Sequence, residues 1–211
     1  MKKLVFAPLV LAFAANTALA ANSVDLRVTG TITPAACNIS STGGGNFDFG
    51  SLSAQELNAT ATTPWGELRN DLSITCSGAT LVGIKALDNR AGTAADSQSR
   101  SFGLGLDSQG NKIGFYHITT TATPTVNGSA GSSTRSQDNG ATWATNASAA
   151  ITTDQNHIVS WNAAGSPDDP VPVTSVSQTI RVNVHIAPEN TLDTSSDITL
   201  DGSATIELVY L

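Results

Sequence analysis

Hydrophobic and polar residues alternate along most of this chain, with a period of two residues. Val, Ile, Thr and Leu dominate the alternating stretches, and Gly, Asn, Asp, Ser and Pro lie between them. Successive side chains of a β-strand point to opposite faces, so this pattern predicts strands buried on one side. The clearest stretches are residues 24–32, 72–76, 81–87, 102–106, 113–118, 157–161, 179–186 and 204–210.

Helical patterning is nearly absent from the sequence. We expect one helical turn over residues 52–57, where Ser53 and Glu56 have the spacing of a capping box. Many short strands separated by turn signals predict an all-β fold, either a sandwich or a barrel. Because a structureless loop of about 30 residues is unusual in a compact domain, we also expect short strands near Val126 and Trp143.

The first twenty residues have the features of a secretory signal peptide. A basic start at Lys2 and Lys3 precedes an apolar run over residues 4–15, and Ala-Leu-Ala at 18–20 forms a small-x-small cleavage pattern. A membrane anchor would need about 20 apolar residues, and two polar residues interrupt the run before that length. We therefore expect export and cleavage after Ala20.

The charge of the mature chain argues against several classes of partner. Removing Lys2 and Lys3 changes the formal net charge from −7 to −9. Nucleic acids and anionic lipids both require clusters of Lys and Arg, and no run of four such residues occurs. A second apolar stretch of spanning length is also missing. We expect no nucleic-acid partner and a mature protein that is not membrane-embedded.

Cys37 and Cys76 are the two cysteines of the chain. In an exported protein, a single pair most economically forms one disulfide. Closing a loop of about 40 residues would stabilise the fold by about 4 kcal/mol in the loop-entropy model. A redox pair would need a C-x-x-C motif, and a metal site would need further ligands at suitable spacing. The prediction is therefore a structural disulfide.

The sequence offers little for catalysis or cofactor binding. His117, His157 and His185 lie in strand-like runs outside any metal-binding motif such as H-E-x-x-H. The Gly-rich residues 41–45 lack the Lys of a phosphate-binding loop, and residues 107–111 lack the acidic residue that closes a calcium loop. Carboxylates are scattered, and no G-x-S-x-G elbow occurs. We expect no enzyme activity, no cofactor and no metal.

The N-terminal end of the mature chain alternates like a strand. Val24, Leu26, Val28 and Ile32 would share one face, with Gly30 as a gap among them. Such a segment can be an ordinary first strand of the sandwich, or it can occupy a groove elsewhere.

The C-terminal end alternates as well. Ile206, Leu208 and Tyr210 would share one face of a strand that runs almost to the last residue. Chain ends usually fray unless they are tied down, so both ends are predicted to need strand partners.

Five segments give the chain a resemblance to the pilin subunits of chaperone-usher fimbriae. Residues 30–37 resemble the Cys-bearing first strand of that family, residues 47–52 the segment after it, and residues 72–76 the strand with the second Cys. Residues 104–113 resemble its L-x-x-x-G hairpin, and the last strand carries a penultimate Tyr210. In this order, behind a signal peptide, the segments span nearly the whole mature chain.

The resemblance implies an incomplete immunoglobulin-like β-sandwich that lacks one strand and is completed by a donor strand. Residues 1–20 would be the signal peptide, residues 21–30 a donor-strand extension and residues 31–211 the pilin-like domain. In such families a periplasmic chaperone first fills the groove by strand addition, and the extension of the next subunit then replaces it. An outer-membrane usher, other pilin subunits, a cell-surface location and a role in cell adhesion are implied as well.

Residue roles follow from the same resemblance. The donor side chains would be Val24, Leu26, Val28 and Ile32, with Gly30 at the tight point. Ile206, Leu208 and Tyr210 would lie on the strand that borders the acceptor groove and is recognised by the chaperone. The alternative is a self-complemented surface domain or a sugar-binding adhesin module, in which residues 119–150 with Trp143 would present a ligand surface.

Overall fold

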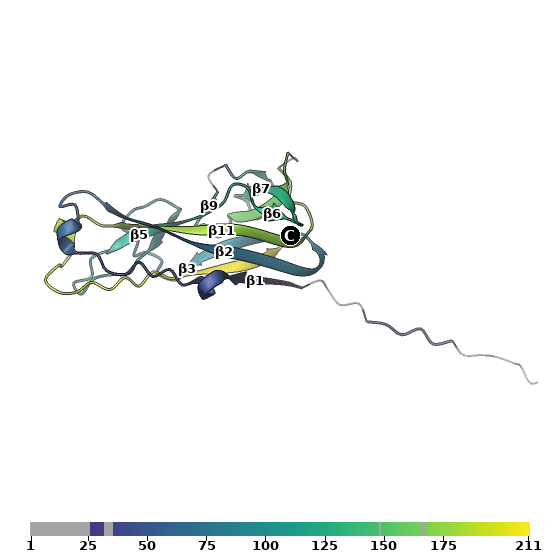
Figure 1. Ribbon diagram of the computed structural model, residues 1–211, viewed down its shortest axis with the longest axis horizontal. Coiled ribbons are helices and arrows are strands. Elements are labelled where there is room, and N and C mark those ends of the chain that lie inside the picture. The colour runs from purple at the N-terminus through teal and green to yellow at the C-terminus, as the bar shows by residue number, and fades with distance from the viewer. Residues whose placement is uncertain (1–25, 32–35, 148, 166–167) are drawn as a thin grey trace, which may run out of the picture. The chain divides into compact units, whose positions relative to one another are not determined.

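The structure is a computed structural model that describes residues 26–31, 36–147, 149–165 and 168–211. The chain divides into two units, Met1–Thr33 and Pro34–Leu211. In the first unit, the described residues 26–31 have no regular secondary structure. The strands described below belong to the second unit (Figure 1).

Strands dominate the second unit, with three short 3-10 turns between them. The turns are η1 (Thr42–Gly45), η2 (Ala54–Glu56) and η3 (Glu189–Thr191). The strands are β1 (Cys37–Ser41), β2 (Thr63–Thr80), β3 (Val82–Asp88), β4 (Ser101–Gly103), β5 (Gly114–Thr120), β6 (Thr125–Val126), β7 (Ser129–Ser136), β8 (Ala144–Thr145), β9 (Ala150–Ile151), β10 (Ile158–Ala163), β11 (Val173–Ile186) and β12 (Ala204–Tyr210).

One continuous set of strand pairs folds over on itself as a nearly closed sandwich, which confirms the all-β prediction. The hydrogen-bonded order is β1-β2-β11-β6-β7-β10-β3-β12, and β5 pairs with β11, β4 and β9. The long strands β2 and β11 run antiparallel side by side (Figure 1). β1 and β12 stand at the two ends of this order, so each has one pairing partner among the described strands.

The core is built by the alternation that the sequence shows. Every second residue of β11 from Val176 to Ile186 is buried, and the residues between them are less buried or exposed. Trp161 from β10 is fully buried, and its indole N–H donates to the side-chain oxygen of Gln178 at 3.1 Å. A buried indole needs such an acceptor, so the polar Gln178 stabilises an otherwise apolar centre.

Most of the strands predicted from the alternation are present. Residues 113–118, 179–186 and 204–210 lie in or almost entirely in strands, and Val126 and Trp143 lie in or beside the short strands β6 and β8. The predicted helical turn is η2, and the Ser53–Glu56 capping box is formed in both directions.

Of the predicted strand over residues 24–32, the structure describes residues 26–31. These residues form no strand, and no described strand pairs with their backbone. The sequence pattern also did not predict β1, the first half of β2, or β7, which is mostly Ser and Thr. The backbones of these segments are paired with neighbouring strands.

Candidate functional site

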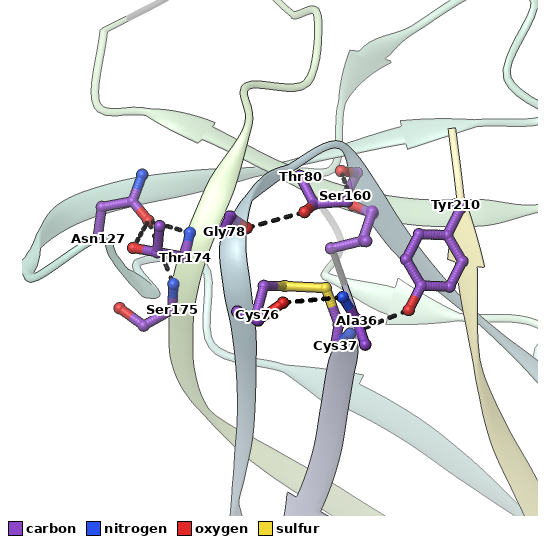
Figure 2. Close-up of a disulfide and its surroundings, with 12 residues drawn as sticks. Ala36, Cys37, Cys76, Gly78, Thr80, Asn127, Ser160, Thr174, Ser175 and Tyr210 are labelled. Carbon is purple, nitrogen blue, oxygen red and sulfur yellow. Dashed lines mark hydrogen bonds between the residues drawn. A yellow bond between two sulfur atoms is a disulfide. The ribbon is translucent and has the colours of Figure 1, made fainter. Parts of the chain in front are cut away.

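None of the described strands lies between β1 and β12, yet the two strands face each other. The Tyr210 hydroxyl of β12 accepts a hydrogen bond from the backbone N–H of Cys37 in β1, with an N···O distance of 3.0 Å (Figure 2). Residues of both strands also line one cavity. We call the space between β1 and β12 the seam.

On β1, the backbone groups of every second residue point into the seam. Cys37 and Cys76 are directly opposite with Cα atoms 4.0 Å apart, a spacing typical of a non-hydrogen-bonded antiparallel pair. The backbone N–H and C=O of Cys37 therefore point away from β2. Because the pattern alternates, the backbones of Ile39 and Ser41 point the same way.

On β12, the even-numbered residues present their backbone to the seam. The N–H of Leu211 donates to the carbonyl of Leu81 at 3.1 Å, and the carbonyl of Ser203 accepts from Asn89 at 3.0 Å. Odd-numbered residues therefore bond toward β3, and alternation directs the even-numbered ones away from it. Those residues are Ala204, Ile206, Leu208 and Tyr210. Two rows of strand backbone thus face each other across the seam.

The wide part of the seam is a cavity of about 460 Å³, lined by apolar side chains and by polar residues such as Ser41, Asn46 and Ser203. Ile39 lines it on the β1 side, and Ile206 lines it on the β12 side. Its floor consists of core side chains from β5, β11 and the segment before β5: Leu104, Tyr116, Ile118, Ile180, Val182 and Val184. Removing this apolar surface from water would favour any apolar side chain that enters from above.

The chain after β1 continues the wall of the cavity without joining the sheet. Gly43 and Gly44 adopt left-handed backbone angles (φ 63° and 64°) and turn the chain away from β2. Phe47 and Phe49 then line the cavity, while Asp48 between them is exposed.

The opposite wall is held by an ion pair. The Arg90 guanidinium contacts the Asp201 carboxylate at 2.7–2.8 Å, and its Nε also donates to the Asp201 carbonyl at 2.9 Å. The Arg90 hydrogen bonds and charge lower the pKa of Asp201. The next residue, Gly202, leaves no spare room, since a Cβ there would lie 3.0 Å from side-chain atoms of both Leu104 and Tyr116.

The cavity carries no charge near neutral pH among its described lining residues. Tyr116 is the one titratable side chain in that lining, and burial raises its pKa, so the phenol stays neutral. The apolar floor therefore favours apolar side chains in any occupant, and the lining offers that occupant no charged partner near neutral pH.

Cys37 and Cys76 form the predicted disulfide (Figure 2). It joins β1 to β2 at the end of the seam where Tyr210 meets Cys37. An edge strand as short as β1 forms few backbone hydrogen bonds to its neighbour. The disulfide therefore helps to hold β1, one of the two strands that border the seam, in place.

The predicted acceptor residues lie where the sequence placed them, on one strand. Ile206 lines the cavity, Leu208 is half-buried against the core, and Tyr210 is 55% exposed with its hydroxyl on Cys37. Ile39 and the cavity floor were missed. The floor residues lie in stretches that were predicted as strands, whereas Ile39 lies outside every such stretch, and nothing local showed that this part of the core lies open.

Three of the predicted donor residues are described. Leu26 and Val28 are 89% and 96% exposed, and Gly30 lies in the same segment without secondary structure. Val24, Ile32 and the predicted signal peptide lie outside the described residues.

The histidines occupy other parts of the sandwich. His117 and His185 pack with Phe115, and His157 is buried with 2% exposure. In the part of the chain that the structure describes, no group of three or more His, Cys, Asp or Glu side chains could hold a metal ion. Within that same part, no helix has the length and apolarity needed to cross a membrane.

Comparison with known proteins places the chain in a family. Residues 26–100 match a family model described as "Protein of unknown function (DUF1120)". This range includes β1, the segment with Phe47 and Phe49, β2 and β3. The chain is 30% identical over 230 residues to "Uncharacterized protein YhcF" of Escherichia coli (strain K12), with 95% of each chain covered. It belongs to the DUF1120 family.

A second relative is similar over nearly the same share of the chain. The chain is 28% identical over 244 residues to "Protein GltF" of Escherichia coli (strain K12), covering 95% of this chain and 94% of GltF. Both similarities extend over nearly the whole chain.

Proposed function

We propose that this DUF1120-family protein is a structural subunit of a chaperone-usher fimbria that polymerises by donor-strand exchange and supports cell adhesion. The observation that carries the proposal is the seam, in which two rows of strand backbone face each other across a cavity with an apolar floor. In this proposal the fold is an incomplete immunoglobulin-like sandwich, and the seam is the place of its missing strand.

Strand addition fits both features of the seam. An added strand would offer hydrogen-bond partners to Ile39 and Ser41 on one side and to Ile206 and Leu208 on the other. Its alternate side chains would cover the cavity floor. An open edge beside exposed core is an aggregation hazard for an exported protein, so a periplasmic chaperone would have to cover the seam first.

The occupant in the assembled fibre would be residues 24–32 of a neighbouring subunit. Leu26 and Val28 are almost fully exposed, which suits side chains that are buried only on assembly. Gly30, two residues after Val28, would allow close approach of the backbone. The outer-membrane usher would then order the exchange, and the fibre would lie on the cell surface.

The decisive experiment is assembly with a defective donor segment. The chain would be co-expressed with a chaperone and usher, either intact or with residues 24–28 deleted, and fibres would be counted by electron microscopy. The proposal expects the deletion variant to accumulate as a chaperone complex without forming fibres. Normal fibres from it would overturn the donor role.

A matched control separates sequence from length. Replacing Leu26 and Val28 with Ser removes the apolar face, whereas replacing Arg27 and Thr29 with Ser changes the other face of the same strand. Only the first variant should fail to assemble. If the purified chain is instead a stable monomer whose own residues 24–32 are protected from proteolysis, the self-complemented alternative replaces the fibre model.

A further inference from the structure

The two ends of the seam differ in a way that strand addition alone does not explain. The cavity reaches Ile39 on β1 and Ile206 on β12, but Cys37, Leu208 and Tyr210 do not line it. Beyond Ile39, β1 and β12 are joined by the hydrogen bond between Tyr210 and Cys37. The seam is therefore open at the Gly202 end and bridged at the Tyr210 end.

The bridge uses a group that an added strand would need. The N–H of Cys37 is the first of the seam-facing donors on β1, followed by those of Ile39 and Ser41. The Tyr210 side chain crosses from β12 to reach it, next to the disulfide (Figure 2). A strand backbone and the phenol hydroxyl cannot both accept this one hydrogen bond well.

We propose that the Tyr210–Cys37 hydrogen bond is a latch that closes one end of the seam and fixes where an added strand stops. The inference depends on the proposed function, because it concerns the register of the strand that the seam accepts. With the latch closed, the strand pairs as far as Ile39 and its side chains are set in register from the open end.

The position of the latch gives it this effect. The disulfide holds Cys37 against β2, and the N–H of Leu211 holds the end of β12 against Leu81. Cys37 and Tyr210 thus both lie on strands that are held by a neighbouring strand, so the Tyr210 hydroxyl lies between two fixed strands. An incoming strand can pass this point only by breaking the bond.

The first test needs no added strand. Tyr210→Phe keeps the ring, which is half-exposed, and removes only the hydroxyl. In the full mature chain, amide hydrogen exchange followed by NMR should show the Cys37 amide exchanging about tenfold faster or more in the variant. The amide of Ser40, which points toward β2, is the internal control and should not change. An unchanged Cys37 amide would overturn the latch.

The second test measures register. Fluorescent peptides with the sequence of residues 21–32, shortened from either end in steps of two residues, would be titrated into wild type and Tyr210→Phe by fluorescence anisotropy. In wild type the affinity should stop rising at a length that reaches Ile39. In the variant the rise should continue for about two more residues and add about two- to tenfold in affinity.

The outcomes separate the latch from the proposed function. Identical length dependence in both proteins would refute the latch while leaving strand addition intact. Absence of binding by every peptide to both proteins would count against strand addition, and the exchange rate of the Cys37 amide would then decide whether the latch exists.

Discussion

β11 and β12 have nearly the same alternating sequence pattern but opposite situations in the sheet. β11 pairs with β2 on one side and with β5 and β6 on the other, so both of its backbone edges are satisfied. β12 pairs with β3 alone among the described strands. The difference teaches that alternation specifies which face a strand buries, whereas the arrangement of the sheet specifies which edges remain available.

The largest expected effect comes from removing the disulfide that joins the edge strand β1 to β2. Replacing Cys37 and Cys76 together with Ser should lower the free energy of unfolding by up to about 4 kcal/mol, since the unfolded chain loses its constraint. Thermal unfolding followed by circular dichroism measures the change. If the strands that are paired on both edges alone determined stability, the variant would unfold at the same temperature as the wild type.

The next effect compares two isoleucines that lie directly opposite each other. Ile74 of β2 is 1% exposed, and its cross-strand partner Ile39 of β1 lines the cavity. Ile74→Ala should cost about 3 kcal/mol of unfolding free energy, because it leaves a void in a closed core. Denaturant titration measures this loss.

Ile39→Ala is the matched variant on the open side. The Ile39 side chain already lacks packing partners on the side of the cavity. Its truncation should therefore lower the free energy of unfolding by only about 1 kcal/mol in the same titration. Uptake of a peptide with the sequence of residues 21–32 should nevertheless weaken, since Ile39 borders the space that the peptide fills. Equal stability losses at Ile39 and Ile74 would contradict the difference between the two regions.

The wall beside Gly202 offers a smaller and more local effect. Asp201→Asn removes the ion pair with Arg90, which is exposed to solvent, so stability should change by less than about 1 kcal/mol. The loosened wall should increase exchange of the amides near Ser203. Lys85→Ala, which breaks the ion pair with Glu207, is the control and should leave those amides unchanged.

The smallest effect is a pH dependence within the closed region. Burial, together with the positive charge of Arg135, lowers the pKa of His157 in the folded protein below its usual value of 6.5. The unfolded chain therefore takes up a proton that the folded chain resists, and stability falls as the pH drops below about 6.5. Unfolding titrations at pH 7.5 and 5.5 measure this loss.

One variant measures the share of the buried histidine in that loss. His157→Gln should reduce the difference in stability between pH 7.5 and 5.5 without removing it, because burial also lowers the pKa of His117. A wild-type protein equally stable at both pH values would contradict the assignment.

Much of the fold could be predicted from the sequence because it is encoded locally. The strand 204–210 was predicted with the bounds of β12, and the capping box at Ser53 was predicted from spacing alone. The polar strand β7 could not be predicted in this way. Its neighbours β10, β6 and β8 hold its backbone, and hydrogen bonds between backbones leave no hydropathy signal.

The candidate site divides along the same line. Ile206, Leu208 and Tyr210 could be assigned to one strand face because the period of two is visible in the sequence. That Tyr210 bonds to Cys37, 173 positions away, could not be foreseen. Such a contact depends on every strand that lies between them in the sheet.

The sequence by itself determined an all-β chain, the disulfide pairing of its two cysteines and two alternating ends. Only the tertiary structure decided that β1 and β12 would face each other with a cavity between them. The physical reason is that side-chain alternation is a property of each strand, whereas an unpaired edge is a property of the whole sheet. The seam exists because the order of strands ends on both sides before the sandwich has closed.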